Sequence, residues 1–317
     1  MSNLKKVALA LFIILSAMSV TTWAGIKHEI TRNFEVSPGG ELTIDTEIGS
    51  IEIKASDQSN IGIEVILDSK TRDEERAQEM FDDFEITFNQ DGDAIEIFAE
   101  YFGNDTRRWN IFGTGRRISL QAEFIITVPQ KFNVYAKTSG GSIHVGDLEG
   151  EVDVRTSGGS LRFDNISGPV KGKTSGGGIM LQSCKGRADV STSGGSIEIG
   201  RVEGEVSAHT SGGGIEVEEV MGEIDASTSG GSIYARISEQ PRGDCRLTTS
   251  GGGITVYLSP DINVYVDART SSGRVKSDFE VSSGNRKKKS SLRGEIGKGG
   301  PELYLRTSGG SIRIIED

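Results

Sequence analysis

One six-residue phrase recurs through the second half of this chain at a constant step of 18 residues. The phrase is Thr-Ser-Gly-Gly, then Ser or Gly, then Ile or Leu, and its evenly spaced copies begin at Thr138, Thr156, Thr174, Thr192, Thr210 and Thr228. Further copies begin at Thr249 and Thr307, and a degraded one at Thr270. A short unit cannot bury its apolar face alone, so we expect each repeat to form one turn, here called a coil, of a stacked array.

Each coil has two apolar stretches with a spacing of two residues. The positions five and seven after each Thr are apolar, as in Ile197 and Ile199, and those four and two before it are mostly aliphatic or small, as in Val206 and Ala208. This spacing predicts two strands per coil, with apolar side chains facing inward and charged ones outward. Glycine stands at both corners between the strands, and we expect it there because it adopts a positive φ without steric cost.

These features predict an all-β fold of the parallel β-solenoid class. Coils stacked about 4.8 Å apart would form two parallel sheets over a narrow dry core. The alternative is an antiparallel meander built from the same nine-residue halves. A single-layer meander would leave its apolar face uncovered, so the solenoid over residues 138–317 is preferred.

The first 24 residues have the order of a secretory signal. Lys5 and Lys6 precede an apolar run, and small and polar residues lead to Ala24, after which we expect cleavage. The alternative is an N-terminal membrane anchor, but the apolar run is too short to span a bilayer comfortably. We therefore expect an exported protein, periplasmic, on the outer surface or secreted, with no integral membrane span after signal removal.

Charge excludes one class of partner. Without residues 1–24, 33 Lys and Arg stand against 46 Asp and Glu, a net charge of −13. Such an acidic chain does not favour nucleic acid, whose phosphates attract basic surfaces.

Residues 25–137 lack the strict period and are predicted to form a β-rich, aromatic-rich cap over the end of the stack. Alternating runs predict strands at 41–53, 61–67, 84–88, 94–101 and 118–128. Residues 46–51 resemble a worn copy of the phrase, so the solenoid can begin this early. One helix is predicted over about 72–83, with Thr71 and Glu74 at capping-box spacing and an apolar stripe of Ala77, Met80, Phe81 and Phe84.

The chain has two cysteines, and both stand where other coils have aliphatic residues. Cys184 shares the column of Leu148, Ile166, Val202 and Val220, whereas Cys245 falls in the Val and Ile column four before Thr249. We predict two separate buried thiols rather than a disulfide. Two basic segments, 104–117 and 282–293, are interpreted as solvated hairpin tips, with contact to anionic envelope lipid or polysaccharide as the alternative.

The pattern resembles a bacterial adhesin-type β-strand-repeat family that is classed as a domain of unknown function. The resemblance is carried by the repeated TSGGSI phrase, by ELTIDTEIGSIEIKA and FIITVPQKFNVYAKTSGGSIHV, and by GEIGKGGPELYLRTSGGSIRI near the end. It covers about residues 35–315 and implies a β-solenoid on exported or envelope-associated proteins. It supplies no catalytic residues.

The sequence predicts no catalytic, cofactor-binding or metal-binding residues. The stretch from Gly168 to Thr174 is one residue short of a phosphate-binding loop and lacks the helix that should follow. The phrase offers no carboxylate for calcium. The three histidines, His28, His144 and His209, fall too far apart along the stack to share a metal.

One carboxylate pair remains as a candidate. Glu198 and Glu216 take the same outward position in adjacent coils, which sets them about 5 Å apart, the separation of retaining glycosidases. We predict a non-catalytic, exported envelope or cell-surface solenoid that acts as an adhesin-like binding or scaffold module for a protein or polysaccharide partner. The alternative is a polysaccharide-acting hydrolase that uses Glu198 and Glu216.

Overall fold

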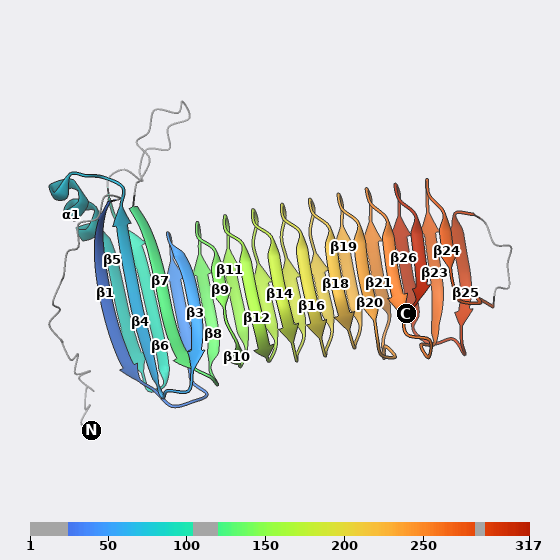
Figure 1. Cartoon of the computed structure of the whole chain (residues 1–317), viewed down its shortest axis with the longest axis horizontal. Coiled ribbons are helices and arrows are strands. Elements are labelled where there is room, and N and C mark those ends of the chain that lie inside the picture. Colours follow the sequence, from blue (N-terminus) through green and yellow to red (C-terminus); the bar gives the residue numbers. More distant parts are fainter. Residues whose placement is uncertain (1–24, 104–119, 283–288) are drawn as a thin grey trace, which may run out of the picture.

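The computed structural model describes residues 25–103, 120–282 and 289–317. Within these residues the chain forms two sheets, of 14 and 13 strands, that face each other along an elongated stack (Figure 1). Strands of successive coils pair in parallel. The predicted all-β parallel solenoid with one helix near the N-terminus is therefore confirmed, and the antiparallel meander is excluded for the repeat region.

The outward row that contains Glu198 and Glu216 lies on the 14-stranded sheet. Its strands, in spatial order, are β1 (Ile26–Glu35), β4 (Asn60–Ser69), β7 (Leu120–Pro129), β3 (Ser50–Ser56), β9 (Ile143–Val145), β12 (Leu161–Ser167), β14 (Ile179–Cys184), β16 (Ile197–Val202), β18 (Ile215–Val220), β20 (Ile233–Ile237), β22 (Ile254–Leu258), β27 (Ile312–Glu316) and β24 (Val275–Ser277), and β10 (Leu148–Glu149) pairs with β12.

The 13-stranded sheet contains the strands that end at a phrase Thr or one residue before it. Its strands, in spatial order, are β25 (Ser291–Ile296), β23 (Val264–Thr270), β26 (Glu302–Thr307), β21 (Cys245–Thr249), β19 (Ile224–Thr228), β17 (Val206–His209), β15 (Ala188–Ser191), β13 (Val170–Lys173), β11 (Val152–Thr156), β8 (Asn133–Thr138), β2 (Glu41–Thr46), β6 (Ala94–Tyr101) and β5 (Phe84–Asp91).

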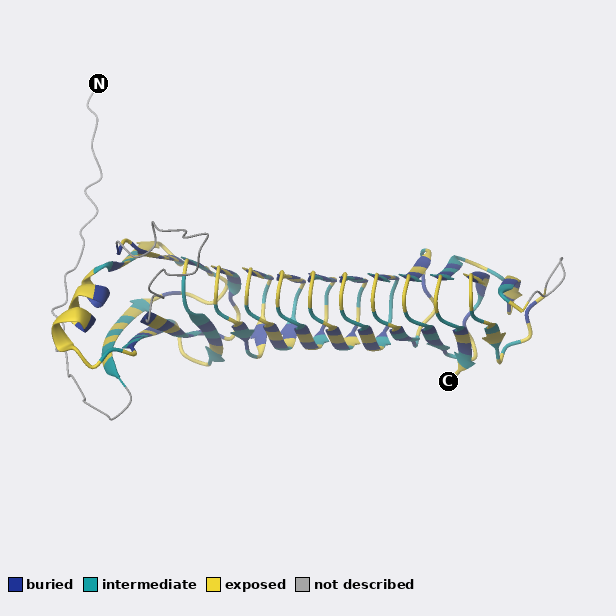
Figure 2. Ribbon diagram, turned by 90° about the horizontal axis from the view of Figure 1, so that it is seen from above, coloured by how far each residue is buried: buried dark blue, intermediate teal, exposed yellow. Residues whose placement is uncertain are grey.

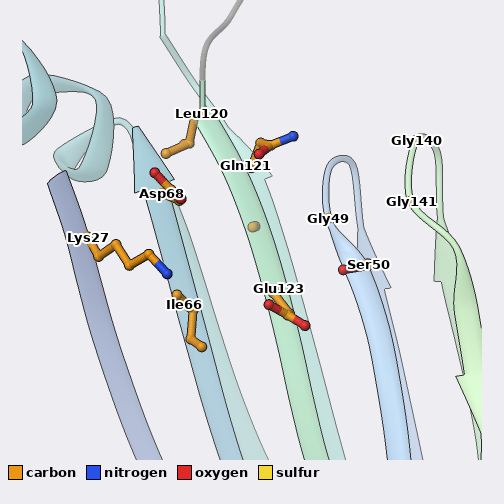
Figure 3. Close-up of a pocket in the computed structure, with 11 residues that line it drawn as sticks. Lys27, Gly49, Ser50, Ile66, Asp68, Leu120, Gln121, Glu123, Gly140 and Gly141 are labelled. Atoms are coloured by element: carbon orange, nitrogen blue, oxygen red, sulfur yellow. The ribbon is translucent and has the colours of Figure 1, made fainter. Parts of the chain in front are cut away.

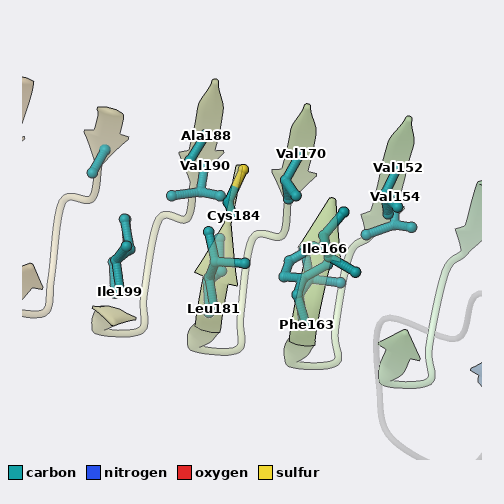
Figure 4. Close-up of a cluster of buried hydrophobic side chains, with 14 of the residues drawn as sticks. Val152, Val154, Phe163, Ile166, Val170, Leu181, Cys184, Ala188, Val190 and Ile199 are labelled. Atoms are coloured by element: carbon teal, nitrogen blue, oxygen red, sulfur yellow. The ribbon is translucent and has the colours of Figure 1, made fainter. Parts of the chain in front are cut away.

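The predicted faces are confirmed by register and burial. Ile197 pairs with Ile215 one coil later, both side chains are buried, and the intervening Glu198 and Glu216 are exposed. Figure 2 shows buried and exposed residues alternating along the strands throughout the stack. In Figure 4 the apolar side chains of the two sheets point toward each other. The interior is thus a thin apolar layer that only inward positions reach.

A buried threonine ladder fixes the corner that precedes each strand of the 14-stranded sheet. In successive coils the phrase Thr is buried, and its hydroxyl donates to the carbonyl of the second phrase glycine in the preceding coil. The oxygen–oxygen distance is 2.7 Å from Thr156 to Gly141 and 2.7 Å from Thr192 to Gly177. The repeated Thr therefore joins each corner to the corner of the preceding coil through a side-chain hydrogen bond.

The reason given above for glycine at the phrase corners is wrong. None of the described phrase glycines has a positive φ. Instead, a Cβ on Gly159 would lie 2.1 Å from the carbonyl oxygen of Gly141, and one on Gly195 would lie 2.3 Å from that of Gly177. These glycines are required because the backbones of adjacent coils approach too closely for any side chain. At the opposite corner Gly150 has a positive φ, of 152°, but the equivalent glycines of the later coils do not, so the expected reason fails there as well: Gly168, Gly186, Gly204, Gly222 and Gly243.

The order of strands at both ends does not follow the chain. The coil that ends with Thr307 and continues into β27 lies between the coil of Thr249 and the coil of Thr270. At the other end, β6 and β7 stack outside β2 and β3, and β1, β4 and β5 are added in antiparallel pairing. The worn phrase at Thr46 stands in register with Thr138. Strand β1 was absent from the predicted strands.

The single described helix, α1 (Glu74–Asp82), lies at the N-terminal end of the stack, where Figure 1 shows it beside β1 and β5. Ala77, Met80 and Phe81 are buried, as predicted. The predicted cap is wrong: the side chain of Asp73 accepts from the backbone N–H of Arg76, whereas Thr71 accepts from the N–H of Asp73. Asp73 therefore takes the N-cap position, which moves the helix start two residues beyond the predicted position.

Several predictions fall on residues outside the described ranges. They are the signal at 1–24, the basic segment 104–117, the start of the strand predicted at 118, and residues 283–288 of the second basic segment. The described helix is too short and too polar to cross a membrane.

Candidate binding face

The outer face of the 14-stranded sheet brings together the carboxylates that the sequence singled out. Strand alternation places Glu198 between buried Ile197 and Ile199, so its side chain points outward. Glu198 is in register with Glu216, and Glu216 is in register with Tyr234. These side chains therefore form one row along the axis of the stack, with about 4.8 Å between neighbouring strands.

A shallow hollow of about 340 Å³ lies beside this row. The surface that lines it is more apolar than polar, although most of its outward side chains are polar or charged: Arg162, Asp164, Met180, Gln182, Glu198, Glu216 and Glu218, with Gly200 between them. Gly200 contributes no side chain, and a Cβ there would lie 2.2 Å from the carbonyl oxygen of Gln182. The backbone at Gly200 therefore leaves no room for a side chain at this point of the hollow.

An aromatic pair lies further along the same face, and the sequence analysis did not identify it. The ring centroids of Tyr234 and Tyr257 are 5.1 Å apart, with an interplanar angle of 47°. The guanidinium of Arg236 lies 5.7 Å from the centroid of Tyr257 and 3.4 Å from the carboxylate of Asp317. Because Tyr234 pairs directly with Thr255, the two rings meet on a diagonal between neighbouring strands. Comparing positions six and eight after the phrase Thr in consecutive coils would have identified the pair.

The carboxylates in the hollow differ from one another in ion pairing, and Asp164 pairs with Arg162 at 3.2 Å. Among the described residues, none of Glu198, Glu216 and Glu218 has a basic side chain within 4.0 Å. In the same coils, Arg201 pairs with Glu219 at 3.3 Å. The hollow therefore has uncompensated negative charge.

Two further hollows lie among the described residues. One, of about 450 Å³, lies on the 13-stranded sheet and is lined by Lys173, His209 and a series of Ser and Thr hydroxyls. The other, of about 390 Å³, lies where β1, β4 and β7 extend past the corners at Gly49 and Gly140, and Figure 3 shows Lys27, Asp68 and Glu123 around it. Both are open surface depressions without a converging set of catalytic groups among the described side chains.

The histidines occupy three separate environments. His28 stacks on Phe81 at 5.5 Å, and Nε2 of His144 lies 2.9 Å from Asp164. Nδ1 of His209 lies 2.7 Å from the hydroxyl of Ser227. Over the described ranges, no group of three or more His, Cys, Asp or Glu side chains is placed to hold a metal ion.

Both cysteines are buried free thiols in different sheets, Cys184 in β14 and Cys245 in β21, as their columns predict. Burial raises the pKa of Cys245 to about 11. The near phosphate-binding loop forms strand β13, and Thr174 belongs to the buried threonine ladder. The equivalent segment of the other coils has the same structural role.

A buried aspartate on the outer face of the 13-stranded sheet was also missed. The carboxylate of Asp267 is almost fully buried beneath arginines. It contacts Arg293, Arg306 at 2.9 Å and Arg269 at 3.4 Å. Burial alone would raise the pKa of Asp267, but hydrogen bonds from Arg293 and Arg306 lower it to about 2. Arg293, assigned above to a basic segment, is used here to join strands.

The chain was compared with protein families, curated proteins and solved structures. No curated protein matches the chain. Among solved structures, a candidate adhesin from Bacteroides fragilis is 13% identical, with 91% of this chain and 97% of that chain covered and a TM-score of 0.41. A candidate cell adhesion protein from Clostridium sporogenes is 14% identical, with 92% and 100% covered and a TM-score of 0.26. A family model described as Toastrack DUF4097 matches residues 40–315. The match spans most of the sequence, and the chain therefore belongs to the Toastrack DUF4097 family.

Proposed function

We propose that this protein is a non-catalytic, adhesin-like module of the bacterial cell envelope that binds a partner on the outer faces of its solenoid. The observation that carries the proposal is the in-register repetition of outward positions, which presents rows of side chains on a long two-sheet stack. Solenoids use such extended surfaces for binding. The family match and the names of the adhesin neighbours are consistent with this proposal.

Export is part of the proposal. Residues 1–24 are the signal, residues 25–137 cap the stack, and residues 138–317 form the repeat region. The experiment is to express the full chain with a C-terminal tag, fractionate the cells and sequence the N-terminus of the envelope-associated protein. We expect it to begin at Gly25. Recovery of the tagged protein in the cytoplasm, with Met1 retained, would contradict export.

The hydrolase alternative is tested separately, because Glu198 and Glu216 do line one hollow. Wild type and the double variant Glu198→Gln, Glu216→Gln are incubated with envelope and extracellular polysaccharides, and reducing-end release is measured. We expect no release by either protein, because regular rows on an open sheet face do not surround a bond that is to be cleaved. Release by wild type that the double variant loses would establish the glycosidase instead.

A further inference from the structure

The Glu–Tyr stripe, defined as Glu198, Glu216, Glu218, Tyr234 and Tyr257, has features that select a class of ligand. It lies on β16, β18, β20 and β22, each of which is paired on both sides. Their backbone N–H and C=O groups are therefore hydrogen-bonded to the neighbouring strands. An extended peptide cannot pair there as a further strand. A ligand on this face must be held by side chains.

The first contribution is charge. Glu198 and Glu216 are exposed, in register and without an ion partner within 4.0 Å among the described residues, and Glu218 extends the charge along the strand. Like charges on neighbouring strands repel each other, and a cation placed between them relieves the repulsion. Arg236, the basic residue beside Tyr257, is turned to Asp317 and does not neutralise these glutamates.

The second contribution is aromatic. Tyr234 follows Glu216 directly in the row, and Tyr257 lies 5.1 Å from it. The face of an aromatic ring carries partial negative charge and attracts C–H groups and cations. A pyranose ring presents a face of C–H groups and an edge of polar groups, so it can lie on the tyrosines while its amino and hydroxyl groups reach the carboxylates.

Resting on the proposed binding function, we propose that the Glu–Tyr stripe is a docking site for a polysaccharide with free amino groups, such as a partly N-deacetylated amino-sugar polymer. Its sugar rings stack on Tyr234 and Tyr257. Its ammonium groups pair with Glu198, Glu216 and Glu218 in and beside the 340 Å³ hollow. Because neighbouring strands repeat at about 4.8 Å along the axis, a linear polymer lies along the stack and contacts several coils.

The test is titration calorimetry of the mature protein with a β-linked glucosamine oligosaccharide and with its fully N-acetylated counterpart. The variants are Tyr234→Ala with Tyr257→Ala, and Glu198→Gln with Glu216→Gln. The matched controls are Tyr265→Ala, an exposed tyrosine on the other sheet, and Glu85→Gln with Glu100→Gln, an exposed pair of cross-strand glutamates far from the stripe. Thermal unfolding of every variant shows whether the fold is intact.

We expect the glucosamine oligosaccharide to bind wild type and both controls alike. The dissociation constant of the glucosamine oligosaccharide should be about tenfold higher, or more, for each stripe variant than for wild type. The N-acetylated oligosaccharide should bind wild type more weakly by the same factor. Raising the salt from about 0.1 M to about 1 M, which shortens the screening length from about 10 Å to about 3 Å, should weaken binding.

Three results overturn the proposal. One is no binding of the glucosamine oligosaccharide to wild type. Another is an equal loss in the Glu85, Glu100 control, which would indicate general charge attraction. The third is tighter binding of a lysine-rich peptide than of the oligosaccharide, weakened by the same stripe variants. This would indicate a peptide partner. Any of these three results, with export and envelope binding intact, overturns this inference and leaves the proposed function standing. If the protein is not exported, the proposed function fails whatever the oligosaccharide does.

Discussion

Gly140 and Gly141 are neighbours in one corner of the stack, yet their surroundings differ. A Cβ on Gly140 would have no atom within 4 Å, whereas one on Gly141 would lie 1.9 Å from the carbonyl oxygen of Gly49 in the adjacent coil. Neither residue has a positive φ. At the residue scale, coil-to-coil contact therefore requires glycine at position 141 but not at position 140. In later coils the first phrase glycine is also confined, since a Cβ on Gly230 would lie 2.6 Å from the carbonyl oxygen of Gly212.

This difference gives a paired prediction. Gly141→Ala should destabilise the protein by about 2 kcal/mol or more, because the coils must move apart to admit the methyl group. Gly140→Ala should change stability by about 0.5 kcal/mol, or raise it slightly by restricting the unfolded chain. Urea denaturation of the two variants is the measurement. Equal losses of unfolding free energy would show that backbone conformation, rather than close stacking, selects both glycines.

At the scale of elements, the C-terminal end is held by a buried ion cluster. Asp267 on β23 joins Arg293 of β25 and Arg306 of β26, so one carboxylate ties the edge strand and the inserted last coil together. The guanidinium of Arg306 also lies 4.0 Å from the ring centroid of Tyr304. Sequence periodicity cannot reveal this cluster, because its members come from segments that deviate from the repeat.

The lowered pKa of Asp267 predicts acid sensitivity. Its pKa is about 2 in the fold and 3.8 ordinarily, so the ionised carboxylate stabilises the fold above about pH 4, and the contribution is lost as the pH falls toward 2. The loss should be about 2 kcal/mol. The unfolding free energy of wild type should therefore fall between pH 4 and pH 2 more steeply than that of Asp267→Asn.

The control is Asp225→Asn, which removes an exposed carboxylate from the same outward row of the 13-stranded sheet. Its profile should run parallel to that of wild type. Identical slopes for wild type and Asp267→Asn over this pH range would show that the cluster does not stabilise the ionised carboxylate.

At the scale of the whole molecule, the repeat is expected to be removable in units of one coil. Deletion of residues 156–173 joins Arg155 to Thr174 and keeps every inward and outward position in register. It also removes Gly172 and Phe163 together. These two residues depend on each other, because a Cβ at Gly172 would lie 3.0 Å from the ring of Phe163. The shortened protein should fold with a β-sheet circular dichroism spectrum and a single thermal transition.

Removal of half a coil, residues 156–164, is the contrasting variant. This deletion places strands of the 14-stranded sheet where strands of the 13-stranded sheet belong. The threonine ladder and the corner glycines then no longer align. We expect loss of cooperative unfolding. A cooperative transition in the half-coil variant, together with its loss in the full-coil variant, would contradict the stacking unit.

The sequence alone determined the coil, its two strands, the inward and outward rows, and the burial of Cys184 and Cys245. A constant step makes every coil meet the same neighbour, so one local pattern describes the central stack. It also placed Glu198 beside Glu216. What the period could not supply was the reason for the corner glycines, because coil-to-coil distances are absent from a sequence.

Only the tertiary structure decided how the stack ends and which side chains meet across coils. The last coil inserts between two earlier ones, and antiparallel strands close the N-terminal end. Except for the hairpin of β5 and β6, these pairings join segments that are not consecutive strands of the chain, where no periodic signal exists. Tyr234 and Tyr257 likewise meet on a diagonal across a longer loop between β20 and β21. Aligning the phrase copies at Thr228 and Thr249 gives the strand register, but the contact between the two rings depends on how the side chains pack in three dimensions.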